Sequence, residues 1–398
     1  MTQLEPFDES SYYQDPAGFF ARLRESRPVA PMPGRRRGWL ITRYTDVRSA
    51  LNNPRLAMDV RHWPGGGRSR ASEGAGSVHA HMLNSDPPVH TRLRRLTRQA
   101  FTPRRVASLR LRAQEIATGL LDEMAAARGA VVDLLDAYAR PLPVTVLCEL
   151  LGIPEADRER LRVAVADYDK PEEVRRVARE LGAYFTTLIA AKRAEPGDDL
   201  LSALALVRTS ASEEGTEDWL TSTELRSTAF QLLLAGFDTT VNLIASGTLA
   251  LLTHREAMAR LREDPSLLPA AVEELLRFTN PLNYVTGRFT TEDLTTGDVV
   301  IPAGEWVFIA TASANRDPAQ FPHQDRLDLG RDTSGHVAFG HGIHYCLGAS
   351  LARMEAEVAF GALLARFPAM SLAVPPEELR WRPVSRINGL ESLPVHLA

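Results

Sequence analysis

The residue best suited to chemistry is Cys346, in the stretch AFGHGIHYCLGASLARMEAEVAFGALLARF at 338–367. Gly340, Gly342 and Gly348 surround it, and a long amphipathic helix follows directly. Glycine permits positive φ angles and adds no side chain, so the backbone can curl around the sulfur and admit a flat molecule. The free N–H groups and the positive macrodipole at a helix start stabilise a thiolate. The pattern therefore predicts a thiolate that binds a soft metal.

Two other interpretations of Cys346 stay open from these residues alone. One is a buried structural cysteine at a helix cap, which is the more common role of an isolated cysteine. The other is a zinc site with His341 and His344, but no second cysteine lies nearby and the usual paired ligand spacing is missing. Zinc is therefore disfavoured.

A second candidate lies in LLLAGFDTTVNLIASG at 232–247, where Asp238 and Thr239 interrupt an apolar run. Thr221 and Glu224 have capping-box spacing, which predicts a helix start before this run. An acid and an alcohol in the middle of a buried helix need a reason. The structural reason would be a hydroxyl that bonds back to the preceding turn, with the acid neutralised by an arginine.

Two charged pairs fall on single helical faces. His90 and Arg94 are four residues apart, and Glu274 and Arg277 are three apart. Such spacing places the side chains next to each other on a helix. Taken alone, both pairs are typical of an ordinary solvated surface.

The elements that must position these residues are mostly helices. Between Thr91 and Leu276 apolar residues recur three and four apart, which is the helical period. Strand patterns occupy 38–44, a hairpin at 298–310 that turns at Pro302 to Gly304, and the C-terminal SLPVHL. We expect a mainly α fold with a small β region, formed by residues 1–398 as a single domain.

Three polar or unusual segments interrupt this pattern. WPGGGRSRASEGAG at 63–76 is too polar and glycine-rich for a core, and we expect a mobile surface loop over a pocket, with plain surface disorder as the alternative. SASEEGTEDW at 210–219 is expected to be a connector. Cys148 lies on an apolar helix and is expected in the core.

The amino-acid composition indicates the cellular compartment of the protein and the partners it does not bind. The chain has 398 residues, 44% of them hydrophobic, and a formal net charge of -4, so nothing drives binding to nucleic acid. The N-terminus lacks the pattern of a signal peptide. The apolar run at 228–252 carries Gln231, Asp238 and Asn242 and fits a buried helix better than a membrane span. With only two cysteines, we expect a reducing, cytoplasmic protein with no membrane partner.

FGHGIHYCLG resembles the haem-binding loop of the cytochrome P450 superfamily, and the resemblance covers nearly the whole chain, through DPPVHTRLRR, CELLGIP, PGDDLLSAL and INGLESLPV. It implies the fold of a soluble bacterial haem-thiolate monooxygenase. A haem b would lie buried between the helix of Asp238 and Thr239 and the Cys346 loop with its helix. Cys346 would be the proximal thiolate that favours O–O cleavage.

The resemblance also implies roles for individual residues. Thr239 would stabilise the bound dioxygen and position water, and Asp238 would connect that water to solvent. The implied cofactor contacts are His90, Arg94, Arg288, His336, Phe339, Gly340, His344, Gly348 and Ala235. A structural lock that supports the haem loop would consist of Glu274, Arg277 and Arg326. Expected substrate contacts are Leu232, Leu282, Tyr284, Val285 and Leu390.

The implied reaction inserts one oxygen atom from O2 into a C–H bond or an alkene of an apolar small molecule in secondary metabolism. Electrons would come from a ferredoxin and its reductase, and an acidic partner could dock on a basic patch of Arg95, Arg98, Arg104 and Arg105. A peroxide-driven oxygenase and a non-catalytic haem-thiolate protein are the alternatives. The region 161–176 is shorter than the family's usual lid, and the substrate stays open between macrolide, terpenoid, fatty acid and cyclic peptide.

Overall fold

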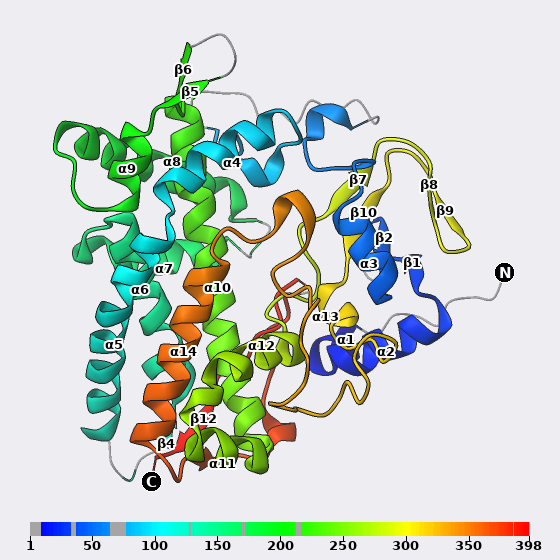
Figure 1. The fold of residues 1–398 in the computed structure, drawn as a ribbon, viewed down its shortest axis with the longest axis vertical. Helices are drawn as coiled ribbons and strands as arrows, with labels where there is room; N and C mark the ends of the chain where they lie inside the picture. Colours follow the sequence, from blue (N-terminus) through cyan, green and yellow to red (C-terminus); the bar gives the residue numbers. More distant parts are fainter. Residues whose placement is uncertain are drawn as a thin grey trace. The chain divides into compact units, whose positions relative to one another are not determined.

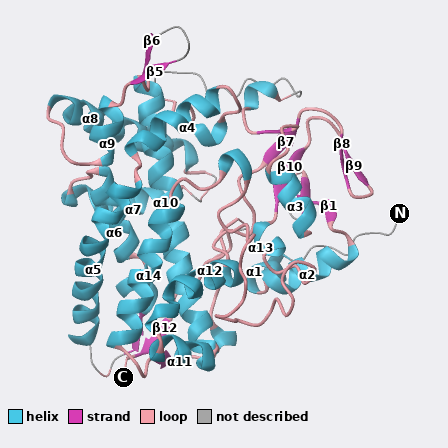
Figure 2. Cartoon of the chain, viewed as in Figure 1, coloured by secondary structure: helices cyan, strands magenta, loops and turns pink. Residues whose placement is uncertain are grey.

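The computed structural model describes residues 9–32, 37–63, 77–126, 129, 131–168, 170, 172–211, 216–384 and 386–397. Its contacts group into two compact units. Unit 1 contains residues 1–57, 117–140 and 239–398, and unit 2 contains residues 58–116 and 141–238. Each unit is described by itself. Figure 1 shows the chain coloured along its sequence, and Figure 2 shows how far helices outweigh strands.

Unit 2 is almost entirely helical. Helix α8 packs against α7 and α9, and α9 also packs against α4 and α6. Buried leucines, valines and aromatic side chains on one face of each helix provide the contacts. The helices are α4 (Val89–Ala100), the first part of α5 (Pro103–Ala126), α6 (Pro141–Leu151), α7 (Glu155–Asp167), α8 (Val174–Ala194), α9 (Leu200–Leu206) and the first part of α10 (Ser222–Thr253).

Unit 1 combines helices with the small sheets. Within it, α12 and α14 lie side by side (Figure 1), and α13 contacts both α2 and α3. The helices are α1 (Glu9–Gln14), α2 (Pro16–Ser26), α3 (Tyr44–Leu51), α11 (Arg255–Glu263), α12 (Leu268–Thr279), α13 (Thr311–Ala314), α14 (Ala349–Arg366) and the remaining parts of α5 and α10. A π-helix covers Leu135–Ala139.

The largest sheet has the strand order β1-β2-β10-β7-β3. A second sheet has the order β11-β12-β4, and β8 with β9 and β5 with β6 form separate two-stranded ribbons. The strands are β1 (Val29–Pro31), β2 (Trp39–Ile41), β3 (Leu56–Ala57), β4 (Val131–Asp133), β5 (Thr209–Ala211), β6 (Thr216–Asp218), β7 (Arg288–Thr290), β8 (Leu294–Thr296), β9 (Val299–Ile301), β10 (Trp306–Ile309), β11 (Ser371–Leu372) and β12 (Pro394–His396).

The strands expected over 298–310 are present as β9 and β10, but the expectation that they pair as a hairpin is wrong. β9 pairs with the preceding strand β8, and the two-residue turn between Thr296 and Val299 begins at Gly297, which has a φ of 56°. A glycine with positive φ followed by aspartate is a strong two-residue hairpin signal. The turn at Pro302 to Gly304 instead leads β10 away to pair with β7 and β2.

The expectation of a mainly helical middle is confirmed, as are the strands near residues 40 and 395. The segment expected as a plain connector at 210–219 includes most of the β5-β6 ribbon. Within 161–176 the structure has the end of α7 and the start of α8. The glycine-rich segment at 63–76 lies outside the described residues apart from Trp63, and the prediction of one domain over the whole chain stays a prediction.

Helix α10 begins as its sequence indicates. The Thr221 backbone N–H donates to the Glu224 carboxylate over 2.8 Å, and the Glu224 N–H donates back to the Thr221 hydroxyl over 3.2 Å. This reciprocal pair satisfies two N–H groups at the helix start. Helix α10 is long and apolar enough to cross a membrane, but 61% of its apolar window is buried inside the protein, as in the core helix of a globular fold.

Candidate active site

The Cys346 loop is tightly turned. Gly340 and Gly342 both have a φ of 74°, which a residue with a side chain rarely adopts. A Cβ atom at Gly342 would lie 2.5 Å from Asn52 Oδ1, so the close approach also requires glycine. The Cys346 N–H donates to the Phe339 carbonyl over 2.9 Å and closes the loop. These backbone contacts fix the position of the sulfur.

Cys346 is exposed, and helix α14 begins three residues later at Ala349, with Gly348 as its N-cap. A Cβ atom at Gly348 would lie 3.9 Å from the Cys346 sulfur, so glycine leaves the space beside the sulfur open. An accessible sulfur before a helix N-terminus, with no side chain at the neighbouring glycine, fits a planar metal-bearing cofactor. The buried structural role left open for Cys346 is therefore wrong, because a structural cysteine would be covered.

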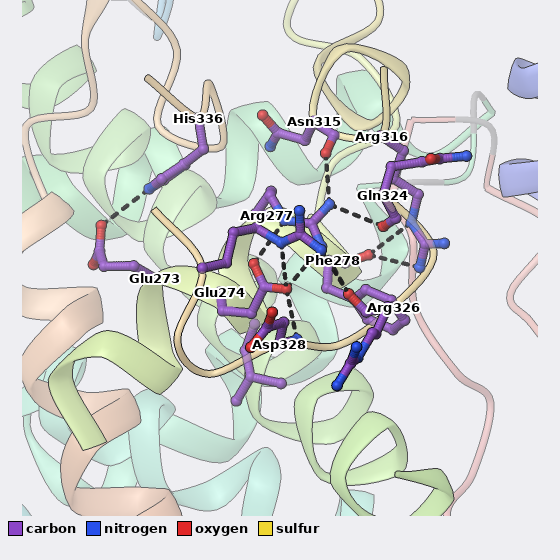
Figure 3. Close-up of polar contacts among 12 residues, drawn as sticks. Glu273, Glu274, Arg277, Phe278, Asn315, Arg316, Gln324, Arg326, Asp328 and His336 are labelled. Carbon is purple, nitrogen blue, oxygen red and sulfur yellow. Dashed lines mark hydrogen bonds and ion pairs between the residues drawn. The ribbon is translucent and has the colours of Figure 1, made fainter. Parts of the chain in front are cut away.

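A charged network lies beneath the same loop. Glu273 accepts two hydrogen bonds from Arg353, at 2.6 and 2.8 Å. It accepts a third from His336 Nε2 at 3.0 Å, which Figure 3 shows. The Arg353 guanidinium lies 4.5 Å from the centre of the Phe339 ring. Burial acts to raise the pKa of Glu273, but the hydrogen bonds from Arg353 and His336 outweigh it and lower the pKa to about 2. This network anchors the Cys346 loop to helix α12.

The assignment of His336 as a haem contact is not supported by this geometry. Its Nδ1 accepts from the Ala338 N–H at 3.2 Å, so its Nε2 carries the proton that Glu273 accepts. Both ring nitrogens are thus used by the protein. The family resemblance implied a cofactor contact for His336, but the path of the loop turns its ring toward Glu273 on α12.

The Glu274–Arg277 pair, which Figure 3 draws, has side chains that are 1% exposed or less. Arg277 donates to both oxygens of Glu274, at 2.7 and 2.8 Å. It also donates to the backbone carbonyls of Asn315 and Gln324, at 2.9 and 3.0 Å, and to that of Arg326 at 3.4 Å. The expected lock therefore exists, and it ties α12 to the segment that leads into the Cys346 loop.

The third arginine of the lock is Arg331, and the choice of Arg326 was wrong. Arg331 Nε donates to Glu274 over 3.2 Å, and its Nη2 donates to the carbonyls of His323 and Arg326. The side chain of Arg331 is 9% exposed, whereas Arg326 is an exposed residue that contributes only its carbonyl. Both arginines stand in the same stretch, and only the path of the loop distinguishes them.

The remaining predicted cofactor contacts divide between the units. In unit 1, Arg288 on β7 is buried and donates to the carbonyls of Ala50 and Leu51, at 3.3 and 3.0 Å, which fixes its side chain. In unit 2, His90 is buried on α4 and Arg94 is half-buried one turn later. Their roles toward a cofactor stay predictions. No group of three His, Cys, Asp or Glu side chains within the described ranges could hold a metal.

One side of helix α10 keeps accessible surface in the middle of the helix. Ala235 is exposed, and Asp238 and Thr239 are half-buried, whereas Phe237 and Val241 are buried. Ala235 and Thr239 are four residues apart and therefore lie on the same face. A small residue and a hydroxyl that keep accessible surface on an otherwise buried apolar helix are suited to face a bound cofactor. Within unit 2, a Cβ at Gly236 would lie 3.0 Å from Leu147.

Glu355 on α14 is a buried carboxyl that sequence reasoning missed. Burial raises its pKa to about 8, although a hydrogen bond with the Thr240 hydroxyl acts in the opposite direction. A glutamate on the apolar face of the helix after Cys346 was the available signal. Glu355 is therefore protonated at neutral pH and lies against the residue that follows Thr239.

Two of the five expected substrate contacts are wrong. Tyr284 is 1% exposed and packs edge-to-face on Phe308, and Leu390 has no exposed surface, so both belong to the core. Leu232, Leu282 and Val285 are half-buried and keep surface that a ligand could contact. Cys148 is buried as expected, and burial raises the pKa of its thiol to about 11.

Comparison with known proteins gives consistent matches. The family model described as Cytochrome P450 matches residues 172–384. Cytochrome P450 107B1 of Saccharopolyspora erythraea is 46% identical over 98% of this chain and 97% of its own length. The 6-deoxyerythronolide B hydroxylase of the same organism is 41% identical over 100% of both chains. The solved structure of the cytochrome P450 PksS from the bacillaene polyketide synthase of Bacillus subtilis has a TM-score of 0.89 at 39% identity, covering 98% of this chain and 100% of its own.

Proposed function

Because this chain belongs to the cytochrome P450 family, we propose that it inserts one oxygen atom from O2 into a C–H bond or alkene of an apolar small molecule. As a P450 monooxygenase, the enzyme uses a haem-thiolate cofactor and O2. The observation that carries the proposal is the accessible Cys346 sulfur, held by a loop of positive-φ glycines before α14. We take the cofactor to be haem b.

The chain's own residues have separate tasks in this reaction. The haem supplies the oxygen activation, and the Cys346 thiolate would hold its iron and donate electron density to it. Arg288, His90, Arg94 and His344 would bind the propionates, since carboxylates are best held by cationic donors.

Proton delivery falls to the accessible face of α10. The Thr239 hydroxyl would hold a water molecule near the reacting oxygen. Asp238, the half-buried residue directly before Thr239, would exchange protons between that water and solvent. Ala235 leaves space on the same face for the small oxygen substrate.

The names of two relatives support a proposal for the substrate class. These names refer to 6-deoxyerythronolide B and to a polyketide synthase. We propose an apolar, polyketide-derived substrate in secondary metabolism, contacted by Leu232, Leu282 and Val285. These half-buried apolar side chains provide hydrophobic surface without distinctive polar groups.

We propose a ferredoxin and its reductase as electron donors to this enzyme in the cytoplasm. Of the four arginines considered for docking, Arg95 pairs with Asp218 and Arg105 pairs with Asp198. Arg98 and Arg104 are exposed and take part in no ion pair among the described residues. These two are the better candidates for attraction of an acidic partner.

The test is the absorption spectrum of the reduced protein under carbon monoxide. The haem-loaded wild type should show the red-shifted Soret band of thiolate ligation, and Cys346→Ser should lose it. Cys148→Ser is the matched control and should keep the band, because the Cys148 thiol is buried in unit 2. A wild-type spectrum without that band would overturn the proposal.

A further inference from the structure

Unit 1 contains a cavity that shares no wall residue with the candidate active site. Its volume is about 300 Å3, which reaches the lower limit of small-molecule pockets. Its apolar walls include Phe20, Phe278 and Trp381. Its polar wall groups include residues on α2 and α10, at the end of α12, after α13 and in the loop near residue 388. We propose that this cavity is a second ligand site, which takes a small organic carboxylate carrying hydroxyl or amino groups.

The ligand should carry a carboxylate because of Arg24 on α2. The residue is 7% exposed, and its Nη1 donates to the carbonyl and hydroxyl oxygens of Ser313, at 3.0 and 2.9 Å. Asp317, Asp325 and Glu25 act on it only at longer range, and it forms no ion pair within the described part of the chain. A buried guanidinium with only neutral hydrogen-bond partners favours an anion, and its planar fork matches a carboxylate.

A second positive group lies on the same wall. Arg316 donates to the Phe278 carbonyl and pairs with Asp325 at 2.9 Å (Figure 3 shows Arg316 and Phe278). Its charge is therefore already balanced. Asp15 also lines the cavity, but one of its oxygens accepts from the Gly18 N–H at the start of α2. Arg24 is thus the group left to bind an anion.

Three buried oxygen atoms on the cavity wall require hydrogen-bond donors on the ligand. Asn280 Nδ2 donates to the Leu282 carbonyl over 2.8 Å, and Asn388 Nδ2 donates to the Thr279 carbonyl over 2.7 Å. These bonds fix both amides, so Oδ1 of each remains as a buried acceptor without a partner among the described residues. The buried hydroxyl of Ser246 on α10 has no partner in this part of the chain either. A ligand needs donors for these atoms, because an unsatisfied buried acceptor is costly.

The three kinds of wall group together define the ligand. Acceptors of the ligand pair with Arg24, its donors pair with the two asparagine oxygens and Ser246, and an apolar body packs on Phe20, Phe278 or Trp381. A hydroxyaryl carboxylate meets all three conditions. Inorganic phosphate or a simple fatty acid meets only part of them.

The test uses the haem-loaded enzyme with its iron blocked by an azole, so that the active site cannot contribute. Isothermal titration with 4-hydroxyphenylacetate should show saturable binding, and 4-hydroxyphenylacetamide, which lacks the charge, should bind at least about tenfold more weakly. Arg24→Gln should weaken binding about tenfold or more, and Ser246→Ala by about threefold to tenfold. Arg22→Gln, on the same helix but absent from the cavity wall, should leave binding unchanged.

Ser246→Ala removes a hydroxyl that has no partner among the described residues, so it keeps the test valid even if Arg24→Gln does not fold. The proposal is overturned if no binding is detected at about 10 mM probe, a concentration that fills even a millimolar site. It is also overturned if the amide binds as well as the acid, or if Ser246→Ala changes nothing. Each of these results leaves the proposed monooxygenase function intact.

Discussion

At the scale of single residues, the most informative feature is the accessible face of α10. Thr239 shares this face with Ala235, which is exposed in the middle of an otherwise apolar helix. A hydroxyl at such a place costs little if it hydrogen-bonds water, and the same water can carry a proton. This arrangement favours an oxygen-driven reaction over the peroxide-driven alternative, which would need an acid-base group in its place.

We expect Thr239→Ala to uncouple the reaction. Consumption of NADPH should continue while product per NADPH falls by about tenfold or more and hydrogen peroxide accumulates, because a positioned proton donor contributes about 10²–10⁴-fold. The matched control is Thr253→Ala on the same helix, where the hydroxyl bonds back to Leu249. Full coupling in Thr239→Ala would contradict the proposed relay.

Glu355 gives a prediction on pH. Its pKa is raised from 4.5 to about 8 by burial, so the folded protein holds a proton that the unfolded chain releases above pH 4.5. The free energy of unfolding should therefore fall as pH rises from about 4.5 to about 8. Glu355→Gln has a neutral side chain of similar shape that does not titrate. The free energy of unfolding of this variant should therefore change less between pH 4.5 and about 8 than that of the wild type.

Urea denaturation of the wild type and of Glu355→Gln, at about pH 5, 6.5 and 8, measures the effect. Glu357→Gln, further along α14, is the comparison variant. If the free energy of unfolding falls equally in the wild type and in Glu355→Gln between these pH values, Glu355 is not the titrating group.

At the scale of elements, the lock joins α12 to the segment before the Cys346 loop through Glu274, Arg277 and Arg331. Because Glu274 is 1% exposed, it needs the hydrogen bonds of both arginines and the Asp328 N–H. The lock therefore fixes the segment before the cysteine loop against α12.

We predict that Arg331→Gln destabilises the protein by about 3 kcal/mol, since it leaves a buried carboxylate with one arginine fewer. Arg326→Gln is the matched control and should change stability by no more than about 0.5 kcal/mol, as expected at the surface. Urea denaturation followed by circular dichroism measures both. Equal losses in the two variants would mean that Arg331 is not the third member.

At the scale of the whole molecule, the proposed docking of a ferredoxin would depend on surface charge. The net charge is -4, so attraction of the proposed acidic partner would have to come from local arginines such as Arg98 and Arg104. Of the four arginines considered for docking, Arg98 and Arg104 are the better candidates, because Arg95 and Arg105 already form ion pairs with aspartates.

Reversal of both charges, Arg98→Glu with Arg104→Glu, should slow electron transfer from ferredoxin about tenfold at low salt. The difference from the wild type should shrink near about 0.5 M salt, where the Debye length is only about 4 Å. Stopped-flow reduction under carbon monoxide measures the rate, with Arg22→Glu as a charge-reversal control. An unchanged rate at every ionic strength would remove the basic patch from the proposal.

Features that depend on near neighbours in the chain could be predicted from the amino-acid sequence. The turns at Gly340 and Gly342, the capping box before α10 and the helical periodicity all arise from residues within a few positions of one another. For the same reason, the local residue pattern around Cys346 is enough to predict a glycine-rich turn followed by a helix start.

Which distant groups meet is decided by the tertiary packing. Whether Arg326 or Arg331 reaches Glu274, and whether His336 turns to a cofactor or to Glu273, depends on the path of a loop. The cavity beside Arg24 is likewise lined by segments far apart in the chain, from α2 to the loop near residue 388. Such contacts follow from long-range packing, which local periodicity does not encode.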